Sequence, residues 1–175
     1  MGVTGGRIIA YGGRGNDIIN GSDGANWENP HDTLYGGAGD DTLNGYRGND
    51  YLDGGAGDDY LDGGSGNDTL VASAGTNQLI GGADNDLMIV KGGSNRMYGA
   101  AGLDTFQIHR TGLEQVVTDL SADDTLDLSD WAAIQPVSVV QDGNHVVVSA
   151  ALERIVCLNT TVATVQSAIT GATYG

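Results

Sequence analysis

Apolar residues recur at a fixed spacing between residues 19 and 106 of this 175-residue chain. From residue 34 onward one apolar residue returns at every ninth position, and most of its immediate neighbours are Thr, Tyr, Asn or Asp. A single apolar residue between two polar ones is typical of a very short strand with one buried face. The recurring positions are Ile19, Leu34, Leu43, Leu52, Leu61, Leu70, Leu79, Met88, Met97 and Phe106.

Glycine and aspartate follow the same nine-residue period. The four units from Gly36 to Val71 read GGAGDDTLN, GYRGNDYLD, GGAGDDYLD and GGSGNDTLV. Glycine occupies positions one and four of each unit, aspartate position six and leucine position eight. In this register ten units span residues 12–107, and the second carries a six-residue insertion around Trp27–His31 that we expect to bulge from a turn.

Repeats this short predict a solenoid, because one three-residue strand cannot bury its apolar residue alone. Two units make one coil of two strands and two turns, and parallel stacking of the coils aligns the apolar residues in a shared core. The sequence therefore predicts an all-β fold, a parallel β-roll over residues 1–110. Its turns form two edges. The position-six residues of the first edge are Asp17, Asp41, Asp59, Asn77 and Asn95, and those of the second edge are Asp32, Asp50, Asp68, Asp86 and Asp104.

The turn composition predicts calcium sites. Glycine at positions one, two and four permits positive φ angles and lets carbonyl groups crowd inward, and aspartate at position six adds a carboxylate. An all-oxygen, negatively charged and flexible site suits Ca²⁺, whereas three histidines and one cysteine are too few for zinc or copper sites. The predicted carboxylate ligands are Asp17, Asp32, Asp41, Asp50, Asp59, Asp68, Asp86 and Asp104. The predicted glycines of the sites are Gly12, Gly13, Gly15, Gly36, Gly37, Gly39, Gly45, Gly48, Gly54, Gly55, Gly57, Gly63, Gly64, Gly66, Gly81, Gly82, Gly99 and Gly102.

The number of ions follows from the two edges. Amides replace aspartate after Asp59 on the first edge, so we expect ions only between its first three turns. The second edge keeps all five carboxylates and is expected to bind up to four ions, which gives about five or six Ca²⁺ in total. Without calcium the stacked carboxylates repel each other, so folding and metal binding are predicted to be one event.

The net charge excludes several partners. With 23 acidic and 7 basic residues the formal net charge is −16, which disfavours nucleic acids and anionic lipid surfaces. No run of about 18 apolar residues encodes a membrane span, and no charged segment followed by an apolar one resembles a Sec-type signal peptide. The single cysteine, Cys157, lies in an apolar run and is predicted to be a buried small side chain.

Residues 111–175 differ from the repeats and are predicted to form a β-rich C-terminal cap. Glycine becomes sparse, valine runs flank a hairpin turn at Gln141–Asn144, and Val162, Val165 and Ile169 are spaced for a short terminal helix. Apolar outward positions in the repeats are interpreted as the surface on which residues 110–170 pack. These positions are Val71, Ile80, Leu87, Ile89 and Val90.

The nonapeptides resemble G-G-x-G-x-D-x-U-x, the repeat of the RTX calcium-binding (hemolysin-type) family. The segment Val116–Trp131 is also similar to the one that follows the β-roll in serralysin-type proteases and mannuronan epimerase R-modules. There the pattern D-F-x-x-x-x-D-x-I-D-L-S is usual. In this chain Asp119-Leu120 stands for D-F, and Asp124, Leu126, Asp127, Leu128 and Ser129 complete the pattern. The resemblance implies a right-handed β-roll, a bacterial origin, type I secretion and folding in the calcium-rich exterior.

Three functions remain open. The first is a noncatalytic, calcium-folded module of a secreted enzyme, since the chain contains none of the common catalytic motifs. The second is binding of a polysaccharide such as alginate, for which tyrosines and Trp27 could offer a platform, although outward tyrosines also suit plain strand surfaces. The third is a spacer or adhesin segment. The platform residues would be Trp27, Tyr35, Tyr46, Tyr51 and Tyr60, and a further calcium site could involve Asp119, Asp123, Asp124, Asp127 and Asp130, which otherwise cap turns.

Overall fold

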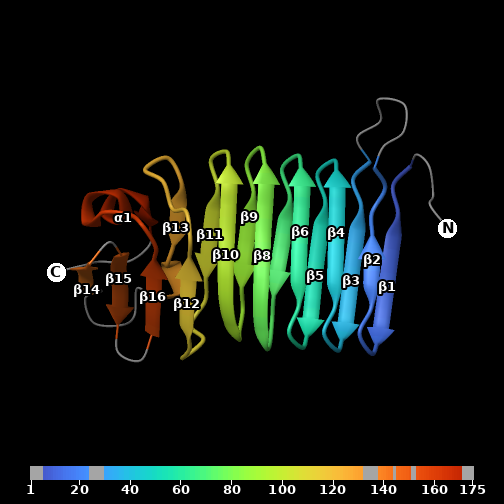
Figure 1. The fold of residues 1–175 in the computed structure, drawn as a ribbon, viewed down its shortest axis with the longest axis horizontal. Helices are drawn as coiled ribbons and strands as arrows, with labels where there is room; N and C mark the ends of the chain where they lie inside the picture. The colour runs from blue at the N-terminus through green and yellow to red at the C-terminus, as the bar shows by residue number, and fades with distance from the viewer. Residues whose placement is uncertain (1–5, 24–29, 132–137, 144, 151–152, 171–175) are drawn as a thin grey trace.

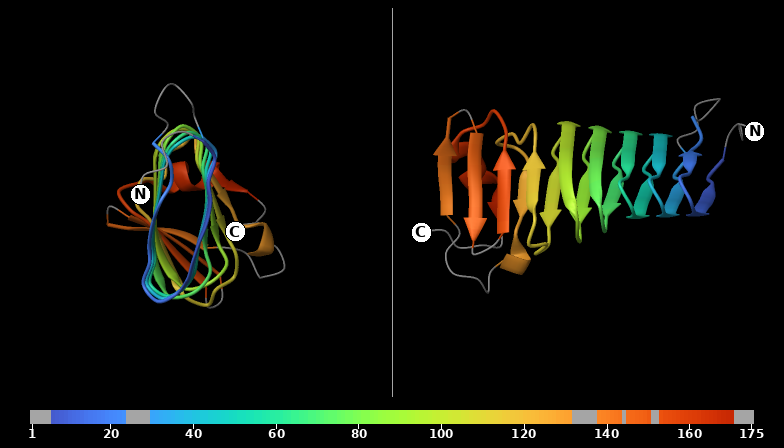
Figure 2. Two further views of the ribbon diagram at one scale, coloured as in Figure 1. Left: turned by 90° about the vertical axis from the view of Figure 1, so that its right-hand side faces the viewer. Right: turned by 60° about the horizontal axis from the view of Figure 1, so that its bottom comes forward.

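The chain winds into a solenoid. The structure, a computed structural model, describes residues 6–23, 30–131, 138–143, 145–150 and 153–170. Along these ranges most successive strands alternate between two sheets, and the coils stack along one axis (Figure 1). Viewed along that axis, the coils superpose into a flattened ring whose long sides are the two sheets (Figure 2). The predicted all-β parallel β-roll is therefore confirmed.

The odd-numbered strands form one sheet, sheet A. All neighbouring strands in it run parallel. In spatial order they are β1 (Ile9–Arg14), β3 (Thr33–Ala38), β5 (Tyr51–Ala56), β7 (Thr69–Ala72), β9 (Leu87–Val90), β11 (Thr105–Ile108), β13 (Thr125–Asp127) and β17 (Ile169–Thr170).

The other sheet, sheet B, combines the returning strands with a C-terminal hairpin. Its parallel strands are β2 (Ile18–Asn20), β4 (Thr42–Arg47), β6 (Tyr60–Ser65), β8 (Thr76–Ala83), β10 (Ser94–Ala101), β12 (Glu114–Val117) and β16 (Glu153–Cys157). Beyond β16 the sheet continues antiparallel through β15 (His145–Ala150) and β14 (Ser138–Asp142).

The position-eight residues form the core because strand register stacks them directly on one another. Leu34 pairs with Leu52 and Leu52 with Leu70 in sheet A, while Leu43 pairs with Leu61 in sheet B. Every one of these leucines has no solvent-exposed surface. Each Leu buried in this way contributes about 1.5–3 kcal/mol of hydrophobic stabilisation.

Both sheets continue past residue 110, where the nine-residue period of the sequence ends. Val117 pairs with Met97 in sheet B, and Leu126 pairs with Phe106 in sheet A, so each extends the buried column by one residue. The interpretation that residues 110–170 pack on outward apolar positions is therefore wrong, because these residues extend the sheets end to end. Val90, counted among those outward positions, instead lies in the core with no exposed surface.

The C-terminal part contains the predicted hairpin and helix. Strands β14 and β15 pair antiparallel, with Gly143 in the left-handed region (φ 61°); Asn144 of the predicted turn lies outside the described residues. Helix α1 (Val162–Ala168) is capped by Thr161, whose side chain accepts a hydrogen bond from Thr164 N. Ile169, expected on the helix, belongs to β17 and pairs with Leu126. No helix in the described part of the chain has the length and apolarity that a membrane span requires.

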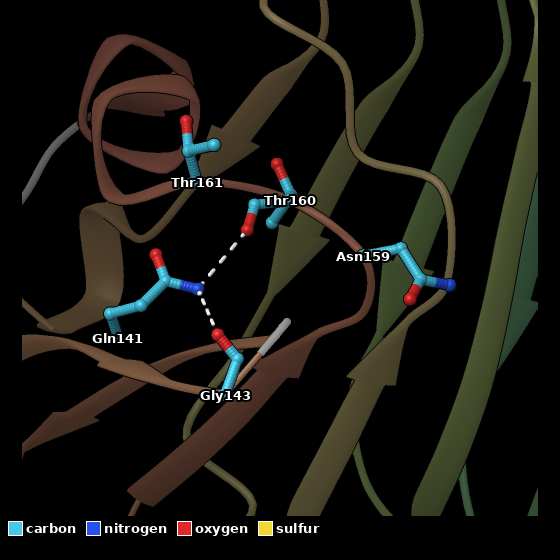
Figure 3. A pocket seen from close by; sticks show the side chains of 5 residues that line it. All are labelled: Gln141, Gly143, Asn159, Thr160 and Thr161. Carbon is cyan, nitrogen blue, oxygen red and sulfur yellow. Dashed lines mark hydrogen bonds between the residues drawn. The ribbon is translucent and has the colours of Figure 1, made fainter.

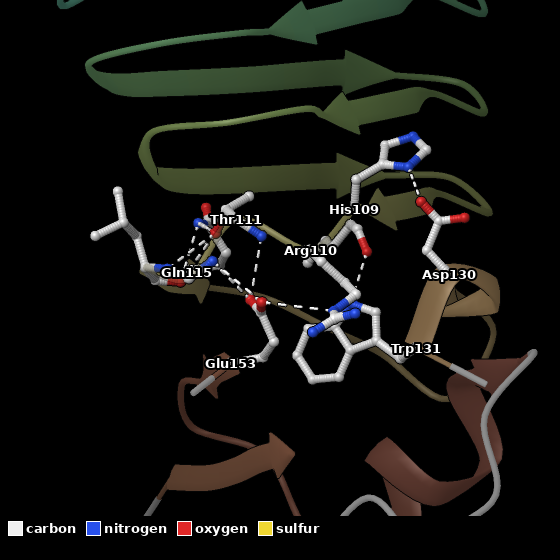
Figure 4. A network of polar contacts seen from close by, with 10 residues as sticks. His109, Arg110, Thr111, Gln115, Asp130, Trp131 and Glu153 are labelled. Atoms are coloured by element: carbon white, nitrogen blue, oxygen red, sulfur yellow. Dashed lines mark hydrogen bonds and ion pairs between the residues drawn. The ribbon is translucent and has the colours of Figure 1, made fainter. Parts of the chain in front are cut away.

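A polar network joins the end of the repeats to the cap (Figure 4). The carboxylate of Glu153, in β16, accepts hydrogen bonds from Thr111 N and Gly112 N at 3.0–3.1 Å. Trp131, at the end of the 3₁₀ helix η1 (Ser129–Trp131), donates from Nε1 to Ile108 O at 3.0 Å. The cap is thus attached through backbone groups of residues 108–112. Cys157 is buried as predicted, and burial raises the pKa of its thiol to about 12.

Candidate metal centre

The position-six aspartates form one row along each edge of the solenoid. In each row the backbone N–H of one aspartate donates to Oδ1 of its counterpart 18 residues later, as Asp50 does to Asp68 at 2.7 Å. The same bond joins Asp32 to Asp50, Asp68 to Asp86, Asp86 to Asp104 and Asp41 to Asp59. After the insertion, which lengthens one coil, Asp17 N reaches Asp41 across 24 residues. The structure therefore brings the predicted aspartates together in two rows.

The second carboxylate oxygen of most of these aspartates is buried without a partner. Among the described residues six buried side-chain oxygens lack any hydrogen bond, and all six are Oδ2 atoms of these rows. They belong to Asp17, Asp41 and Asp59 on the first edge and to Asp50, Asp68 and Asp86 on the second. A buried carboxylate oxygen without a partner is costly, so this arrangement fits a cation bound at the turns.

Position-one glycines provide the space in which these oxygens lie. A Cβ built on Gly45 would lie 2.5 Å from Asp50 Oδ2 and 2.5 Å from the carbonyl oxygen of Gly63, in the next turn of that edge. On Gly36 it would be as close to Asp41 Oδ2 and to the Gly54 carbonyl. Real Cβ atoms essentially never approach other atoms within 3.0 Å, so only glycine fits here. Carboxylate and carbonyl oxygens from adjacent turns therefore converge, as calcium ligands do.

The predicted glycines serve two different purposes. Those at positions two and four have positive φ, for example Gly37 at 113° and Gly39 at 124°, so they do form the tight turn. Those at position one do not have positive φ, and that part of the prediction is wrong: they are needed for space rather than for backbone conformation. Within the described repeats three residues other than glycine also take the left-handed conformation, namely Tyr46, Asp84 and Ala100.

Burial and mutual repulsion shift these carboxyl groups toward the protonated form. Burial is the main cause that raises the pKa of Asp68 to about 8, partly offset by the hydrogen bond from Asp50 N and reinforced by the nearby Asp50 and Asp86. Burial likewise raises the pKa of Asp50 and Asp86 to about 7 and that of Asp59 to about 6. A calcium ion would reverse this preference by stabilising the charged form.

Amides complete the first edge after Asp59. Asp59 N donates to Asn77 Oδ1 at 2.8 Å, and Asn77 Nδ2 donates to Asn95 Oδ1 at 2.7 Å. Asn95 in turn donates from its backbone N and Nδ2 to Gln115 Oε1 at 3.0 and 2.9 Å. These neutral groups satisfy one another, as expected for an edge on which calcium sites end at Asp59.

At each end of the second edge a protein group binds the outermost carboxylate. Asp32 differs from its neighbours because its Oδ2 accepts hydrogen bonds from Ser22 N at 2.7 Å and Ser22 Oγ at 3.1 Å. At the far end Asp104 N donates to Asp124 Oδ1, and Asp124 Oδ2 accepts from Ser121 N at 2.7 Å. Asp124 and Gln115 thus extend the two rows. The sequence analysis did not predict this, because both residues lie 20 positions after their predecessors in the row instead of 18. The recurring D-T-L at residues 124–126 was the available signal.

Three of the remaining acidic residues near the cap bind protein groups, whereas Asp123 is exposed. Asp119 accepts from Gly99 N and Ala100 N, Asp127 accepts from Ser129 N, and Asp130 contacts His109 (Figure 4). In the described ranges no three His, Cys, Asp or Glu side chains cluster as a metal site made of side chains alone would require. The turns of the rows differ from such a site. Each turn offers a single carboxylate, and backbone carbonyl oxygens lie near it, as Gly63 O does near Asp50.

A second row of side chains at position five lies outside the aspartates and was not predicted. On the second edge Asn67 N donates to Asn49 Oδ1 at 3.0 Å, and Asn85 N to Asn67 Oδ1 at 2.8 Å. On the first edge Asp58 N donates to Asp40 Oδ1 at 2.9 Å. All of these side chains are exposed, so they brace the turns without entering the metal sites.

A polar pocket lies in the cap, away from both rows (Figure 3). Its lining residues are Gln141, Gly143, Asn159, Thr160 and Thr161. Gln141 Nε2 spans it with hydrogen bonds to Gly143 O at 3.1 Å and Thr160 O at 3.4 Å. None of the lining residues that the structure describes is charged, so they do not offer the carboxylates of a calcium site.

Comparison with protein families agrees with the turn geometry. The family model for the RTX calcium-binding nonapeptide repeat matches residues 9–27, 31–61, 53–88, 62–96 and 71–106. No curated protein matches the chain. The matched residues contain all eight predicted aspartates and more than half of the chain. The chain therefore belongs to the family of proteins with RTX calcium-binding nonapeptide repeats, and it is a calcium-binding module.

Proposed function

We propose that this chain is a noncatalytic RTX module of a secreted bacterial protein, which is unfolded at low calcium and folds when it reaches the calcium-rich exterior. The parent protein would be an extracellular enzyme whose type I secretion and folding the module supports. The observation that carries the proposal is the set of six buried Oδ2 atoms without partners. With these carboxylates ionised, such a fold has a large unmet requirement for positive charge, which a high calcium concentration would meet.

The residues that would hold calcium follow from the geometry. On the first edge they are Asp17, Asp41 and Asp59, and on the second Asp50, Asp68 and Asp86, each with the carbonyl groups of its own and the following turn. Bound Ca²⁺ supplies the positive charge that offsets repulsion along the rows. One ion for each of these aspartates gives six, three on each edge, whereas the sequence predicted two on the first edge and up to four on the second. Affinities on the order of 10⁻⁴–10⁻³ M, as in extracellular calcium modules, would make folding follow the calcium gradient across the cell envelope.

The tyrosine geometry does not favour polysaccharide binding. Tyr35 and Tyr51 lie on sheet A and Tyr60 on sheet B, so the proposed platform is divided between the two faces of the solenoid. Tyr11 and Tyr35 stack face to face with ring centroids 4.9 Å apart, which uses one face of each ring within the protein. Trp27, the other aromatic residue considered, lies outside the described residues. We therefore propose calcium-dependent folding alone.

Isothermal titration calorimetry tests the proposal. Titration of the metal-free chain with CaCl₂ is expected to show cooperative binding of five or six ions, with a large heat of folding. MgCl₂ serves as the control, because Mg²⁺ requires a compact octahedral site and does not readily exchange its water for carbonyl oxygens. Equal binding of both metals, or no binding of calcium at millimolar concentration, would contradict the proposal.

A further inference from the structure

Two turns of the first edge depart from the calcium-site pattern at more than the acidic position. In turn 72–77 and turn 90–95, the amides Asn77 and Asn95 replace aspartate, as already described. In the same two turns Ala72 and Val90 replace the position-one glycine. The structure also shows position two outside the left-handed region at Ser73, whereas Gly37, Gly55 and Gly64 have positive φ there. Three features of the turn therefore change together.

Steric contact explains why positions one and six change as a pair. In the turns with an unpartnered Oδ2, a Cβ at position one would come within 3.0 Å of that oxygen. Ala72 and Val90 therefore exclude a carboxylate in this conformation. Their side chains instead join the hydrophobic core, where they are 1% and 0% exposed. Ile108 occupies the equivalent place before Gln115 and is also buried.

The amide nitrogens provide the donors that these turns need. Asn77 Nδ2 donates to the carbonyl of Ala74 at 3.1 Å, and Asn95 Nδ2 donates to that of Gly92 at 2.8 Å. Each of these nitrogens also donates to the next amide oxygen of the row. A single neutral NH₂ group thus links a turn carbonyl to the adjacent turn, which removes the requirement for a cation.

We propose that the residue at position one is a determinant of calcium binding in this chain, jointly with the acid at position six. Turn 72–77 then does not bind calcium in the wild-type chain. Glycine at positions one and two, together with aspartate at position six, restores a calcium site there. The presence of aspartate alone does not create a site. This inference rests on the proposed calcium-dependent folding and adds the rule that decides which turns take part.

The direct test converts turn 72–77 into a copy of its neighbour. The variant A72G/S73G/N77D gives the turn GGAGTD, which matches Gly54–Asp59 except at Thr76. Calcium stoichiometry is measured by equilibrium dialysis and calorimetry for the wild type, this variant and N77D alone. The triple variant is expected to bind one more ion than the wild type. N77D is expected to bind no additional ion, because Ala72 excludes the carboxylate from the position that it takes in the glycine-containing turns. It is also expected to have a lower Tm in calcium, because a carboxylate oxygen in place of Asn77 Nδ2 would face the Ala74 carbonyl and Asn95 Oδ1 without a proton to donate.

A converse variant keeps the test decisive if the triple variant does not fold. G54A retains Asp59 and adds only the Cβ that would collide with its Oδ2. It is expected to lose one ion, whereas the control A56S, at an exposed position of the same turn, keeps the wild-type number. An unchanged number of ions in G54A, or an additional ion in N77D, would overturn the inference while leaving calcium-dependent folding intact. If the wild type binds no calcium, both proposals fail.

Discussion

The backbone N–H of Asp50 donates to Oδ1 of Asp68 at 2.7 Å, while Oδ2 of Asp68 is buried without any partner. One carboxylate therefore has two different roles. Its first oxygen joins adjacent coils of the fold by a hydrogen bond, and its second oxygen is left without a partner and requires a cation. The hydrogen bond therefore sets the spacing of the turns in the fold, and the free oxygen makes the stability of that fold dependent on a cation.

Removal of the Asp68 charge is expected to weaken calcium-dependent stability. D68N keeps an oxygen that can accept the hydrogen bond from Asp50 N but loses the anionic ligand. At a calcium concentration ten times the Kd, loss of one site lowers the free energy of unfolding by about 1.4 kcal/mol. Urea unfolding in calcium measures this change, with the exposed A83S as control. A D68N variant as stable as A83S would show that no ion binds at this turn.

Calcium affinity is expected to fall as the pH is lowered from 8 to 6. In the calcium-free fold the pKa of Asp68 is about 8 and that of Asp50 and Asp86 about 7, compared with a usual value of 3.8. Because these values are raised, protons stabilise the calcium-free fold below pH 3.8, and this stabilisation is lost as the pH rises through 7–8. Protons and calcium therefore compete for the same carboxylates. Calorimetry at pH 8 and pH 6 measures the effect, and equal affinities at both would contradict it.

Gln115 is expected to stabilise the metal-free end of the first edge. It is 1% exposed, accepts from Asn95 N and Nδ2, and donates to Gly93 O at 2.8 Å. Q115L leaves these buried groups unpaired and should lower the free energy of unfolding by about 1–3 kcal/mol. The number of bound ions should not change. The exposed control Q78A should have little effect, and a stability loss in Q115L accompanied by loss of an ion would refute the assignment.

Glu153 is expected to hold the cap onto the repeats. Its buried carboxylate accepts from Thr111 N and Gly112 N, whereas Glu114 is exposed and pairs with Arg154 at the surface. E153A should destabilise the calcium-loaded protein by about 1–3 kcal/mol, because two backbone donors lose their acceptor. E114A should cost less than about 1 kcal/mol, as surface ion pairs do. Thermal unfolding of both variants in calcium compares them, and equal Tm values would rule out this role.

The repeat period predicted most of the fold and the two aspartate rows. Position eight fixed the core, and position six placed Asp41 and Asp59 on one edge and Asp50 and Asp68 on the other. The nine-residue period no longer holds after β11, because the turn there is two residues longer than the others. The contributions of Gln115 and Asp124 to the rows were therefore not predicted. Asp124 was instead considered as a ligand of a separate site near residues 119–130.

Other features depend on contacts that no local pattern reveals. Val90 was counted among the outward apolar positions, yet it occupies the place of a position-one glycine in the core. The hydrogen bonds from Ser22 to Asp32, and from Thr111 to Glu153, join residues 10 and 42 positions apart. Such hydrogen-bond partners can be identified only from the three-dimensional arrangement of the coils.

Far-UV circular dichroism of the whole chain at neutral pH, in excess chelator and then in 10 mM CaCl₂ (about ten times the weakest expected Kd), tests the central claim most directly. We predict a spectrum of disordered chain in chelator and a strand spectrum after calcium is added, with reversal when chelator is restored. A strand spectrum that persists unchanged in chelator would show that the carboxylate rows are tolerated without calcium, and would contradict the account.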